Sequence, residues 1–557
     1  MNIASYAPLA VVLPFLGAAI AFLLIRHSRT QRAVSISTLS ITLILELFLL
    51  QNAAVHGATA VFIGGWMPPF GITLVVDQFS ALMLVISTAV SLAVLIYATG
   101  QGIADGDEDG PISIFHPTYL ILVAGVSNAF MSGDLFNLYV GFEILLTASY
   151  VLMTLGGTTP RIRAGVTYVV VSVVSSMLFL IAIGMIYAAT GTINLADLAV
   201  KLGEIDPSTQ MMLHLMLLVA FGIKAAVFPL SFWLPDSYPT APAPVTAVFA
   251  GLLTKVGVYA MVRTETLLFP GDRINTLLMV VAILTMLVGI LGALAQADIK
   301  RMLSFTLVSH IGFMIFGLAI STVVGLSAAV FYVAHHITVQ TSLFLVTGLI
   351  ERRGGTANMD RLGGLAKLSP VLGVLFFIPA MNLAGIPPFS GFLGKLGILQ
   401  AGVELGSPIA YVAVAASVLT SLLTLLAIAR VWNRAFWRRP EDALHPDPVL
   451  LATNADGSAV HSTRPPANGS ASTESASESS DESSDEATGD STEPVAGRQP
   501  ANVLPRTMVG PTMGLVGLGV LLTLLAGPLF EISDNAAQNM LDRTDYIEAV
   551  LGEGSAP

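Results

Sequence analysis

The stretch AGVTYVVVSVVSSMLFLIAIGMIYAAT, residues 164–190, carries no charged side chain. A helix needs about 20 mostly apolar residues to cross a bilayer, so this stretch is long enough. Thirteen comparable runs occur along the chain, at 6–25, 33–52, 73–98, 114–132, 134–155, 208–231, 241–263, 273–296, 302–321, 323–349, 369–403, 408–432 and 509–530. They are continuous rather than alternating in polarity, which excludes a β-barrel. We therefore predict an all-α polytopic membrane protein with about fourteen transmembrane helices.

The composition agrees with this fold class. Of the 557 residues, 54% are hydrophobic and 11% are charged, and the mean hydropathy is +0.79. A soluble protein has about a quarter of its residues charged. The chain has no cysteine, which excludes disulfides and thiolate sites. It also has no nucleotide-binding, metalloprotease or cofactor motif. We expect no metal site, no cofactor and no enzymatic activity.

Basic residues indicate the orientation of the predicted helices. They gather in the odd-numbered connections, at 26–32, 161–163, 300–301, 352–367 and 430–439. Lys and Arg favour the cytoplasmic side, so both termini are expected to be extracellular. The first run, 6–25, has no basic segment before it and is interpreted as a retained helix rather than a signal peptide.

One region is polar rather than apolar. Residues 440–505 contain the acidic, low-complexity tract GSASTESASESSDESSDEATGDSTE at 469–493. Such a composition cannot bury enough apolar surface to order itself. We predict a disordered cytoplasmic linker ahead of the last helix, 509–530, which an external tail, 531–557, then follows. A solvated spacer is favoured over a partner-binding segment.

Ionisable side chains inside the predicted helices are the candidate functional residues. Of 25 Lys and Arg, only three are assigned to spans, Lys224, Lys255 and Lys395. A buried charge in a membrane is costly and usually functional. An ammonium without water releases its proton more readily, and a nearby carboxylate such as Glu143 opposes that release. A spaced series of such groups forms a proton relay. The alternative is that these residues form ion pairs that serve packing alone.

Histidines extend the series. His335 and His336 lie in the middle of the run 323–349, and histidine exchanges protons near neutral pH. A histidine satisfied by a neighbouring hydroxyl is the alternative for His336. Four further ionisable residues in or near spans are predicted to be interfacial or structural: Glu46, Asp77, His214 and His310.

Two predicted helices contain prolines that interrupt them. They are FGIKAAVFPLSFWLPDSYPTAPAPV at 221–245 and PAMNLAGIPPFSGFLGKLGIL at 379–399. Proline removes a backbone donor, and unwound backbone at membrane depth is tolerated only inside protein or along a cavity. Paired interrupted helices indicate a transporter, and each has a lysine close by, Lys224 and Lys395. Kinks that only assist packing are the alternative.

These motifs resemble a known family. GDLFNLYVGFEILLTASYVL (133–152), the segment 221–263 and LAGIPPFSGFLGK (383–395) are similar to the antiporter-like superfamily, which includes the membrane-arm subunits of complex I and the Mrp cation/proton antiporters. The segment 63–87 resembles the D-type Mrp subunits in particular. The resemblance covers nearly the whole chain except the acidic linker.

The resemblance implies a domain organisation. Two inverted five-helix repeats would comprise predicted helices 4–8 (114–263) and 9–13 (273–435), with helices 7 and 12 broken. The N-terminal helices 1–3 would occupy 1–113. The chain would be a multi-pass protein of a prokaryotic plasma membrane.

The resemblance also implies roles for five residues. Glu143 matches the glutamate of helix 5 and Lys224 its lysine partner in helix 7. Lys255 matches the lysine that links two half-channels, His336 the histidine of helix 11, and Lys395 the exit-side proton carrier of helix 12.

The chain departs from the family at one position of the relay. Relatives often carry a lysine four residues after the matched histidine, where this chain has Gln340. Glutamine carries no proton charge, so the middle of the relay would rely on His335, His336 and water. Asp236, in the first interrupted helix, is a further supporting candidate.

The sequence predicts a proton-translocating subunit of a multisubunit antiporter that exchanges Na⁺ or K⁺ for protons. Its partners would be the other Mrp subunits (A, C and the small ones) and the bilayer, with no nucleic acid. Two alternatives stay open at this point. One is a pumping subunit of a redox-driven complex I-like or hydrogenase assembly, and the other is a scaffold with an inactive channel.

Overall fold

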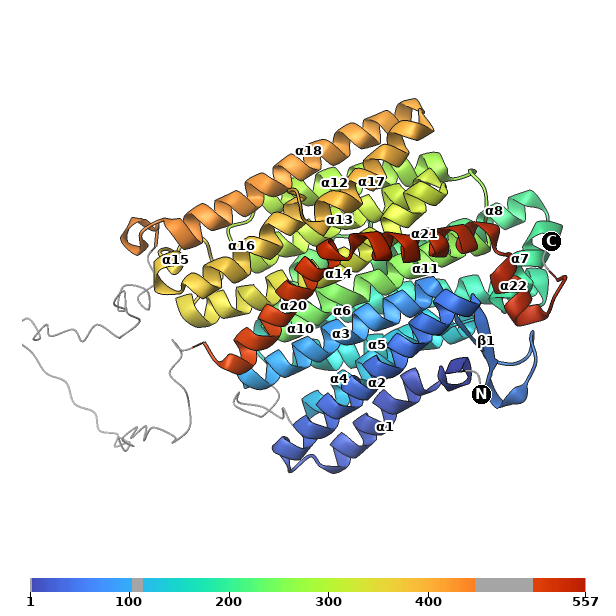
Figure 1. Cartoon of the computed structure of the whole chain (residues 1–557), viewed down its shortest axis with the longest axis horizontal. Coiled ribbons are helices and arrows are strands. Elements are labelled where there is room, and N and C mark those ends of the chain that lie inside the picture. The colour runs from blue at the N-terminus through green and yellow to red at the C-terminus, as the bar shows by residue number, and fades with distance from the viewer. Residues whose placement is uncertain (1–2, 103–113, 446–503, 556–557) are drawn as a thin grey trace, which may run out of the picture.

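The computed structural model describes residues 3–102, 114–445 and 504–555. Most of the predicted acidic linker, residues 446–503, lies outside the described residues. The described chain is an elongated bundle of roughly parallel helices with one short hairpin (Figure 1). Twelve helices among the described residues are long and apolar enough to span a membrane. The polytopic helical fold is therefore confirmed.

The N-terminal part contains three long helices and the hairpin. Its elements are η1 (Ile3–Tyr6), α1 (Leu9–Leu23), α2 (Ser28–His56), β1 (Thr59–Phe62), η2 (Ile63–Gly65), β2 (Thr73–Val76) and α3 (Gln78–Gln101). β1 and β2 pair antiparallel, with Thr59 opposite Val76. The hairpin lies at the end of the bundle that also holds both ends of the chain (Figure 1).

The next part holds the first interrupted helix. Its elements are α4 (Phe115–Met131), α5 (Leu135–Thr154), α6 (Thr159–Thr190), α7 (Leu195–Lys201), η4 (Leu202–Glu204), α8 (Pro207–Ala225), α9 (Leu234–Ser237), η5 (Tyr238–Thr240), α10 (Ala243–Val248), η6 (Phe249–Leu253) and α11 (Thr254–Leu267). The turn η6 is π-helical, so α10, η6 and α11 form one span with an irregular middle.

The remaining elements hold the second interruption. They are α12 (Asn275–Leu294), α13 (Ile299–Ile320), α14 (Val323–Gly354), α15 (Leu365–Leu368), α16 (Pro370–Ala384), α17 (Ser390–Leu405), α18 (Pro408–Val431), η7 (Trp432–Trp437), η8 (Pro440–Asp442), α20 (Arg506–Leu524), α21 (Ala526–Asp542) and α22 (Thr544–Leu551). The segment 531–551, assigned to an external tail, is thus helical. α21 packs against α14, α3 and α11, and α22 packs against α7 and β1.

Two of the predicted spans correspond to shorter helices. The run 114–132 forms α4, which has 17 residues, and the run 369–403 is divided between α16 and α17. Both predicted interruptions are present, since α8 ends at Ala225 before α9 and α16 ends at Ala384 before α17. The count of fourteen transmembrane helices stays a prediction.

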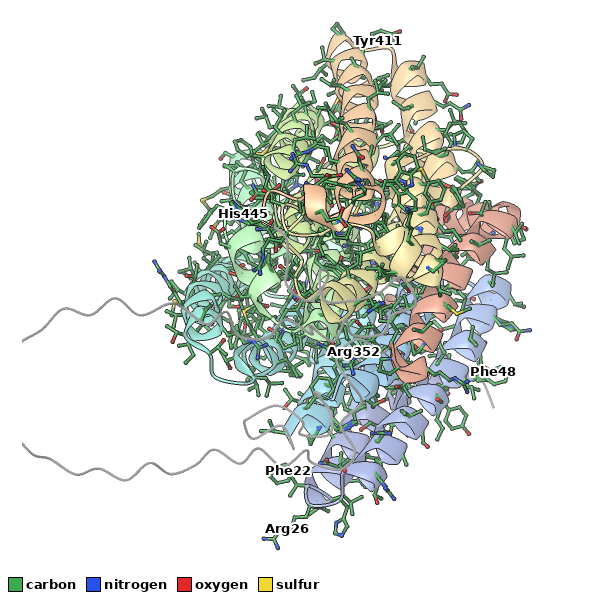
Figure 2. All side chains as sticks on the ribbon, turned by 90° about the vertical axis from the view of Figure 1, so that its left-hand side faces the viewer. Phe22, Arg26, Phe48, Arg352, Tyr411 and His445 are labelled. Atoms are coloured by element: carbon green, nitrogen blue, oxygen red, sulfur yellow. The ribbon has the colours of Figure 1, made fainter. Side chains whose placement is uncertain are left out.

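The surface of the bundle is apolar, as a lipid-facing surface must be. Phe22 and Phe48 are 56% and 49% exposed and point away from the helices (Figure 2). Further large apolar residues are exposed along α1, α2, α6 and α18. Arg26 and Arg352 lie at the end of the bundle opposite the two termini (Figure 2). This arrangement agrees with the predicted charge bias, and the orientation relative to the membrane stays a prediction.

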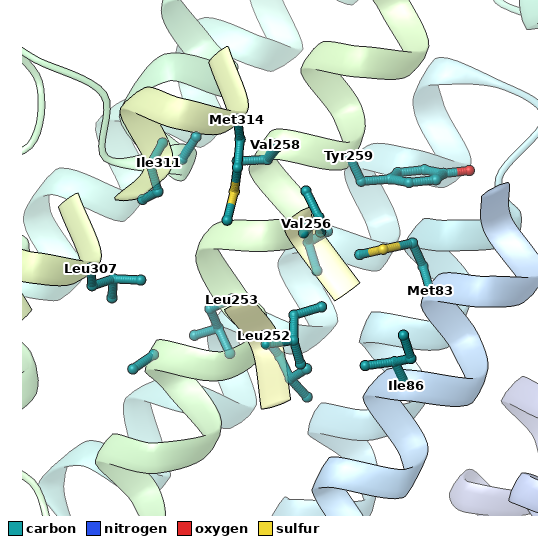
Figure 3. Close-up of a cluster of buried hydrophobic side chains, with 14 of the residues drawn as sticks. Met83, Ile86, Leu252, Leu253, Val256, Val258, Tyr259, Leu307, Ile311 and Met314 are labelled. Atoms are coloured by element: carbon teal, nitrogen blue, oxygen red, sulfur yellow. The ribbon is translucent and has the colours of Figure 1, made fainter. Parts of the chain in front are cut away.

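The interior is centred on α14. This helix packs against α3, α10, α13, α16, α17, α20 and α21, and its residues from Gly325 to Ile350 are all buried. Around the irregular span α10–α11, side chains of α3 such as Met83 and of α13 such as Ile311 and Met314 form a close-packed apolar cluster (Figure 3). Polar groups on α14 between Gly325 and Ile350 are therefore surrounded by protein rather than by lipid.

Two corners of the fold have the same backbone pattern. Asp134 pairs with Asn194 in one isolated bridge, and Asp298 pairs with Asn358 in another. Asp134 and Asp298 also cap the following helices, α5 and α13. Both members of the second pair lie 164 positions after their counterparts in the first, because 298 − 134 and 358 − 194 are both 164. The equal spacing agrees with the two inverted repeats that the resemblance implies, and the repeats stay a prediction.

One basic residue inside a span corrects the sequence analysis. Arg263 is not among the three cations assigned to spans, but it lies in α11 and is 4% exposed. Its guanidinium donates to both oxygens of Asp77, at 2.7 and 2.9 Å, and Tyr546 of α22 lies 5.1 Å from it. The bidentate partner makes burial of this charge acceptable. The pair ties α3, α11 and the C-terminal helix together.

Replacing Asp77 should therefore destabilise the bundle. Asp77→Asn keeps a side-chain acceptor at the start of α3 but leaves Arg263 without its counter-charge. Removing one partner of a buried pair costs about 3–5 kcal/mol. We expect a clearly lower midpoint of thermal unfolding in detergent. Asp442→Ala removes an exposed ion pair with Arg439 and serves as the control, with an unchanged midpoint. Equal midpoints for both variants would contradict a stabilising role of the Asp77–Arg263 pair.

Candidate functional site

Three lysines lie in the interior of the bundle. Lys224, Lys255 and Lys395 are 8%, 0% and 4% exposed. Among the described residues, no carboxylate lies within 4.0 Å of any of the three ammonium groups. Each ammonium instead has neutral oxygen partners. The sequence predicted buried lysines, but not how their charge is accommodated.

Lys224 lies at the end of α8, one residue before the helix stops. Its ammonium donates to the Ser176 hydroxyl of α6 at 3.1 Å and lies 4.6 Å from the centre of the Phe142 ring of α5. Glu143, the next residue of α5, interacts with it electrostatically without a close ion pair. A cavity of about 20 Å³ adjoins Lys224 and is lined by Ser172, Ser175 and Tyr168 among others, which is room for about one water molecule.

Lys255 lies just after the π-helical turn η6. Its ammonium donates to the carbonyl oxygen of Ala250 at 2.6 Å. The wider turn leaves this carbonyl free for a side chain, and such turns often occur at functional sites. The flanking residues Leu252, Leu253 and Val256 extend into the apolar cluster (Figure 3). Lys255 is therefore held by one backbone dipole in apolar surroundings.

Lys395 in α17 reaches back to the end of α16. Its ammonium donates to the carbonyl oxygens of Leu383 and Ala384, each at 3.1 Å. Both carbonyls belong to the last turn of α16, where no following helical N–H is available. The Phe313 ring lies 4.9 Å away. The interruption of the helix thus supplies the ligands of the lysine.

The interruptions themselves are satisfied by neighbouring helices. The backbone N–H of Phe228 donates to the Thr285 hydroxyl, and that of Ser390 donates to the Thr523 hydroxyl. Unwound backbone at membrane depth needs such partners. α8 and α11 also approach closely beside the lysines, because a Cβ on Gly257 would lie 2.6 Å from the backbone nitrogen of Ala225. This contact places Lys224 and Lys255 at similar depth.

A group of histidines lies between Lys255 and Lys395. His335 of α14 shares a 3.0 Å hydrogen bond with the Ser390 hydroxyl of α17. His336 is fully buried, and within the described residues neither ring nitrogen has a hydrogen-bond partner. Both Lys255 and Lys395 interact with His336 electrostatically. The two predicted histidines are therefore placed between the two lysines.

His310 of α13 joins this group, although the sequence analysis placed it among the interfacial or structural residues. Its Nδ1 lies 2.6 Å from the Tyr332 hydroxyl, and its ring centre lies 5.2 Å from that of His336. The residue is fully buried. Its position near the middle of the predicted span 302–321 was the one available signal. The contact with α14 could not be inferred from the sequence.

The remaining sequence candidates lie differently. Gln340 is buried and donates to the Leu303 carbonyl at 2.8 Å. Asp236 is at the surface, with 66% of its side chain exposed, and pairs with Arg301 at 2.7 Å. Among the described residues there is no group of three or more His, Asp or Glu that could hold a metal ion. Asp236 is thus not brought together with the buried lysines.

A family model described as NADH:quinone oxidoreductase/Mrp antiporter, transmembrane, matches residues 132–424. The chain belongs to this family. The match includes the interrupted helices and all three buried lysines, and it confirms the resemblance inferred from the motifs.

Several relatives within the family are similar over most of the chain. The D-type subunit of the Na⁺/H⁺ antiporter of Alkalihalophilus pseudofirmus is 36% identical over 548 residues, which is 98% of this chain and 99% of the relative. The corresponding D-type subunit of Bacillus subtilis is 37% identical over 446 residues, 80% of this chain and 89% of the relative.

Solved structures have the same fold. A chain of the Mrp complex from Dietzia sp. superimposes with a TM-score of 0.84 at 31% identity, and the match covers 99% of this chain and all of that one. A chain of respiratory complex I from Thermus thermophilus gives a TM-score of 0.74 at 23% identity, covering 96% and 99%. The second likeness concerns the fold alone.

The placement of Lys395 depends on a glycine at the interruption. Gly385 has φ +82°, and a Cβ there would lie 2.9 Å from Cδ of Lys395. Gly406 also has a positive φ, +67°, but its nearest neighbours are 3.9 Å away. Alanine in this conformation costs about 1–2 kcal/mol. Gly385→Ala should therefore lower the midpoint of thermal unfolding further than Gly406→Ala, because it also displaces Lys395. Equal losses would show that the lysine is not tightly placed.

Proposed function

We propose that this chain is the proton-translocating subunit of a multisubunit Na⁺/H⁺ antiporter. The observation that carries the proposal is the series of buried protonatable groups without a close counter-charge, from Lys224 through Lys255 and the histidines to Lys395. The relatives of 36% and 37% identity are D-type subunits of Na⁺/H⁺ antiporters, which supports this substrate pair. The membrane-spanning helices and the family argue for a transporter rather than a catalytic enzyme.

The proposed route runs across the middle of the bundle. A proton at Lys224, next to Glu143, would pass to Lys255 where α8 and α11 touch. The histidines of α13 and α14 would carry it on to Lys395. Because neutral oxygens hold the ammonium groups, no step has to break a close ion pair between a lysine and a carboxylate. Cation entry through this subunit or through a partner is equally compatible with the route.

The setting of the chain is part of the proposal. The Mrp complex of Dietzia sp. contains a chain with this fold, so we propose that this protein works in a complex with other Mrp subunits. The plasma membrane with both termini outside is the proposed location. The two inverted repeats, 114–263 and 273–435, would form the two halves of the route, flanked by the N-terminal helices of 1–113.

A pumping subunit of a redox-driven complex is the second candidate. Its support is the fold shared with complex I of Thermus thermophilus. That similarity is 23% in identity, against 36% to an antiporter subunit along nearly the whole chain. We therefore favour the antiporter.

Loss of Lys224 tests the proposal directly. In inverted vesicles that carry the complete complex, Na⁺ should dissipate a preformed pH gradient with the unaltered chain. Lys224→Ala and Glu143→Gln should reduce this flux by about tenfold or more, equivalent to about 1.4 kcal/mol in the barrier. Native gels should show intact assembly. Lys201→Ala, which removes a half-buried lysine of α7 that pairs with Asp197 at 2.8 Å, is the matched control and should behave like the unaltered chain. Full activity of Lys224→Ala in an assembled complex would refute the route.

His310 provides a second test of the route. We expect His310→Gln to lower Na⁺-driven proton flux by about tenfold, because glutamine can hydrogen-bond Tyr332 but cannot carry the proton. His27→Gln, at an exposed position before α2, should leave the flux unchanged. If His310→Gln shows normal Na⁺-driven proton flux, protons pass from Lys255 to Lys395 without His310. The residue then only positions Tyr332.

A further inference from the structure

Glu46 is a buried carboxyl that the proposed route does not use. It lies in the middle of α2 and is 0% exposed. Neither carboxyl oxygen has a hydrogen-bond partner among the described residues. The sequence predicts an interfacial or structural role for it, but a structural acid at such a position would normally be paired.

Two hydroxyl groups from neighbouring helices face this carboxyl. They belong to Thr88 of α3 and Ser127 of α4. Threonines buried in helices commonly donate to the carbonyl four residues earlier, as Thr42 does to Thr38. The Thr88 hydroxyl makes no such bond in the described structure, so it is available to Glu46. The three side chains form a small polar group where α2, α3 and α4 meet.

Within the described part of the chain, no cation balances a charge at this position. The basic groups of α2 and α4 stand toward the helix ends. Arg32 precedes Glu46 by 14 residues, and His56 follows it by 10. At 1.5 Å per residue these intervals correspond to about 21 and 15 Å along the helix. Burial is the main influence on Glu46, and the Thr88 and Ser127 hydroxyls are its polar neighbours among the described residues. An ionised carboxylate there would cost several kcal/mol, whereas a carboxyl with its proton can donate a hydrogen bond to either hydroxyl.

The group lies at the depth of the proposed proton route. α4 and α5 run antiparallel and touch at two glycines. A Cβ on Gly125 would lie 2.6 Å from the backbone nitrogen of Leu145, and one on Gly141 would lie 2.9 Å from that of Ala129. In this register Ser127 is level with Glu143, since 125 + 145 and 129 + 141 both equal 127 + 143. Glu46 and Glu143 therefore lie at one depth on two sides of α4.

We propose that Glu46, with the hydroxyls of Thr88 and Ser127, is a further proton-binding site. It holds a proton in the resting protein and exchanges it during transport. The exchange breaks and re-forms the O–H bond of the carboxyl, and a hydroxyl that relays the proton accepts one on its oxygen as it releases its own, so no bond is gained or lost overall. The transport role rests on the proposed antiport function, while proton binding by Glu46 does not. A Na⁺ ion held by the same oxygens is the competing occupant.

A carbodiimide distinguishes these occupants, because it reacts with protonated carboxyls in apolar surroundings. Vesicles carrying the complete complex are treated with dicyclohexylcarbodiimide at neutral pH, with NaCl or choline chloride, and the peptide containing Glu46 is analysed by mass spectrometry. We expect modification of Glu46 to the same extent in both salts. Glu404, an exposed acid at the end of α17, should stay unmodified. Protection by Na⁺ would overturn the proton assignment in favour of a Na⁺ site. An unmodified Glu46 that reacts after denaturation would overturn it altogether.

A transport measurement separates a proton-exchanging Glu46 from one that only packs. Glu46→Gln keeps the shape and a hydrogen-bond donor but carries no exchangeable acid proton. We expect a several-fold lower Na⁺-driven proton flux with intact assembly, and recovery in Glu46→Asp. Normal flux in Glu46→Gln together with loss of flux in Lys224→Ala would refute the transport role of Glu46 and leave the proposed route intact. Normal flux in both variants would refute the proposed route, and the carbodiimide result would still decide whether Glu46 binds a proton.

Discussion

The structure depends on how an ammonium group is held inside a membrane-spanning bundle without a close counter-charge. Lys395 uses two carbonyls at the end of α16, and Lys255 uses the Ala250 carbonyl in a π-helical turn. A regular α-helix would use these carbonyls for its own backbone. Each irregularity costs helical hydrogen bonds. This loss is tolerated at membrane depth only where the backbone is surrounded by protein. The broken helices, the π-helical turn and the burial of α14 from Gly325 to Ile350 are therefore consequences of one requirement.

The same bundle also contains ion pairs of the ordinary kind. Arg263 has both oxygens of Asp77, and Lys300 has Glu351 at 2.7 Å. These pairs connect helices near their ends, where removing one partner would leave the other charge unbalanced. The interior lysines differ because hydroxyls, carbonyls and aromatic rings hold them. Such neutral dipoles stabilise the charged form without excluding the neutral one, which is the property that a proton carrier needs.

The sequence predicted the features that arise from chain-local physics. Long apolar runs indicated the membrane fold, and Pro229 and Pro387 indicated where two helices stop. The buried lysines were visible because charges are rare in such runs. Three features could not be predicted from the sequence. The π-helical turn before Lys255 has no proline to mark it, the contact of His310 with Tyr332 depends on packing of α13 on α14, and Arg263 is accommodated by Asp77, 186 positions away. Each arises from tertiary contacts that single-sequence patterns do not encode.

Lys224 and Lys395, at the two ends of the lysine series, have different surroundings. Lys224 has an acid nearby, so the stability of its charge changes whenever Glu143 gains or loses a proton. Lys395 donates to fixed carbonyl dipoles instead, and its titratable neighbours are the histidines of α13 and α14. An acid can therefore alter the charge balance at the Lys224 end, whereas histidines are the groups that can alter it at the Lys395 end. In the proposed relay, Glu143 lies at the end where an acid can switch the charge balance, and Glu46, level with Glu143 across α4, lies at the same end.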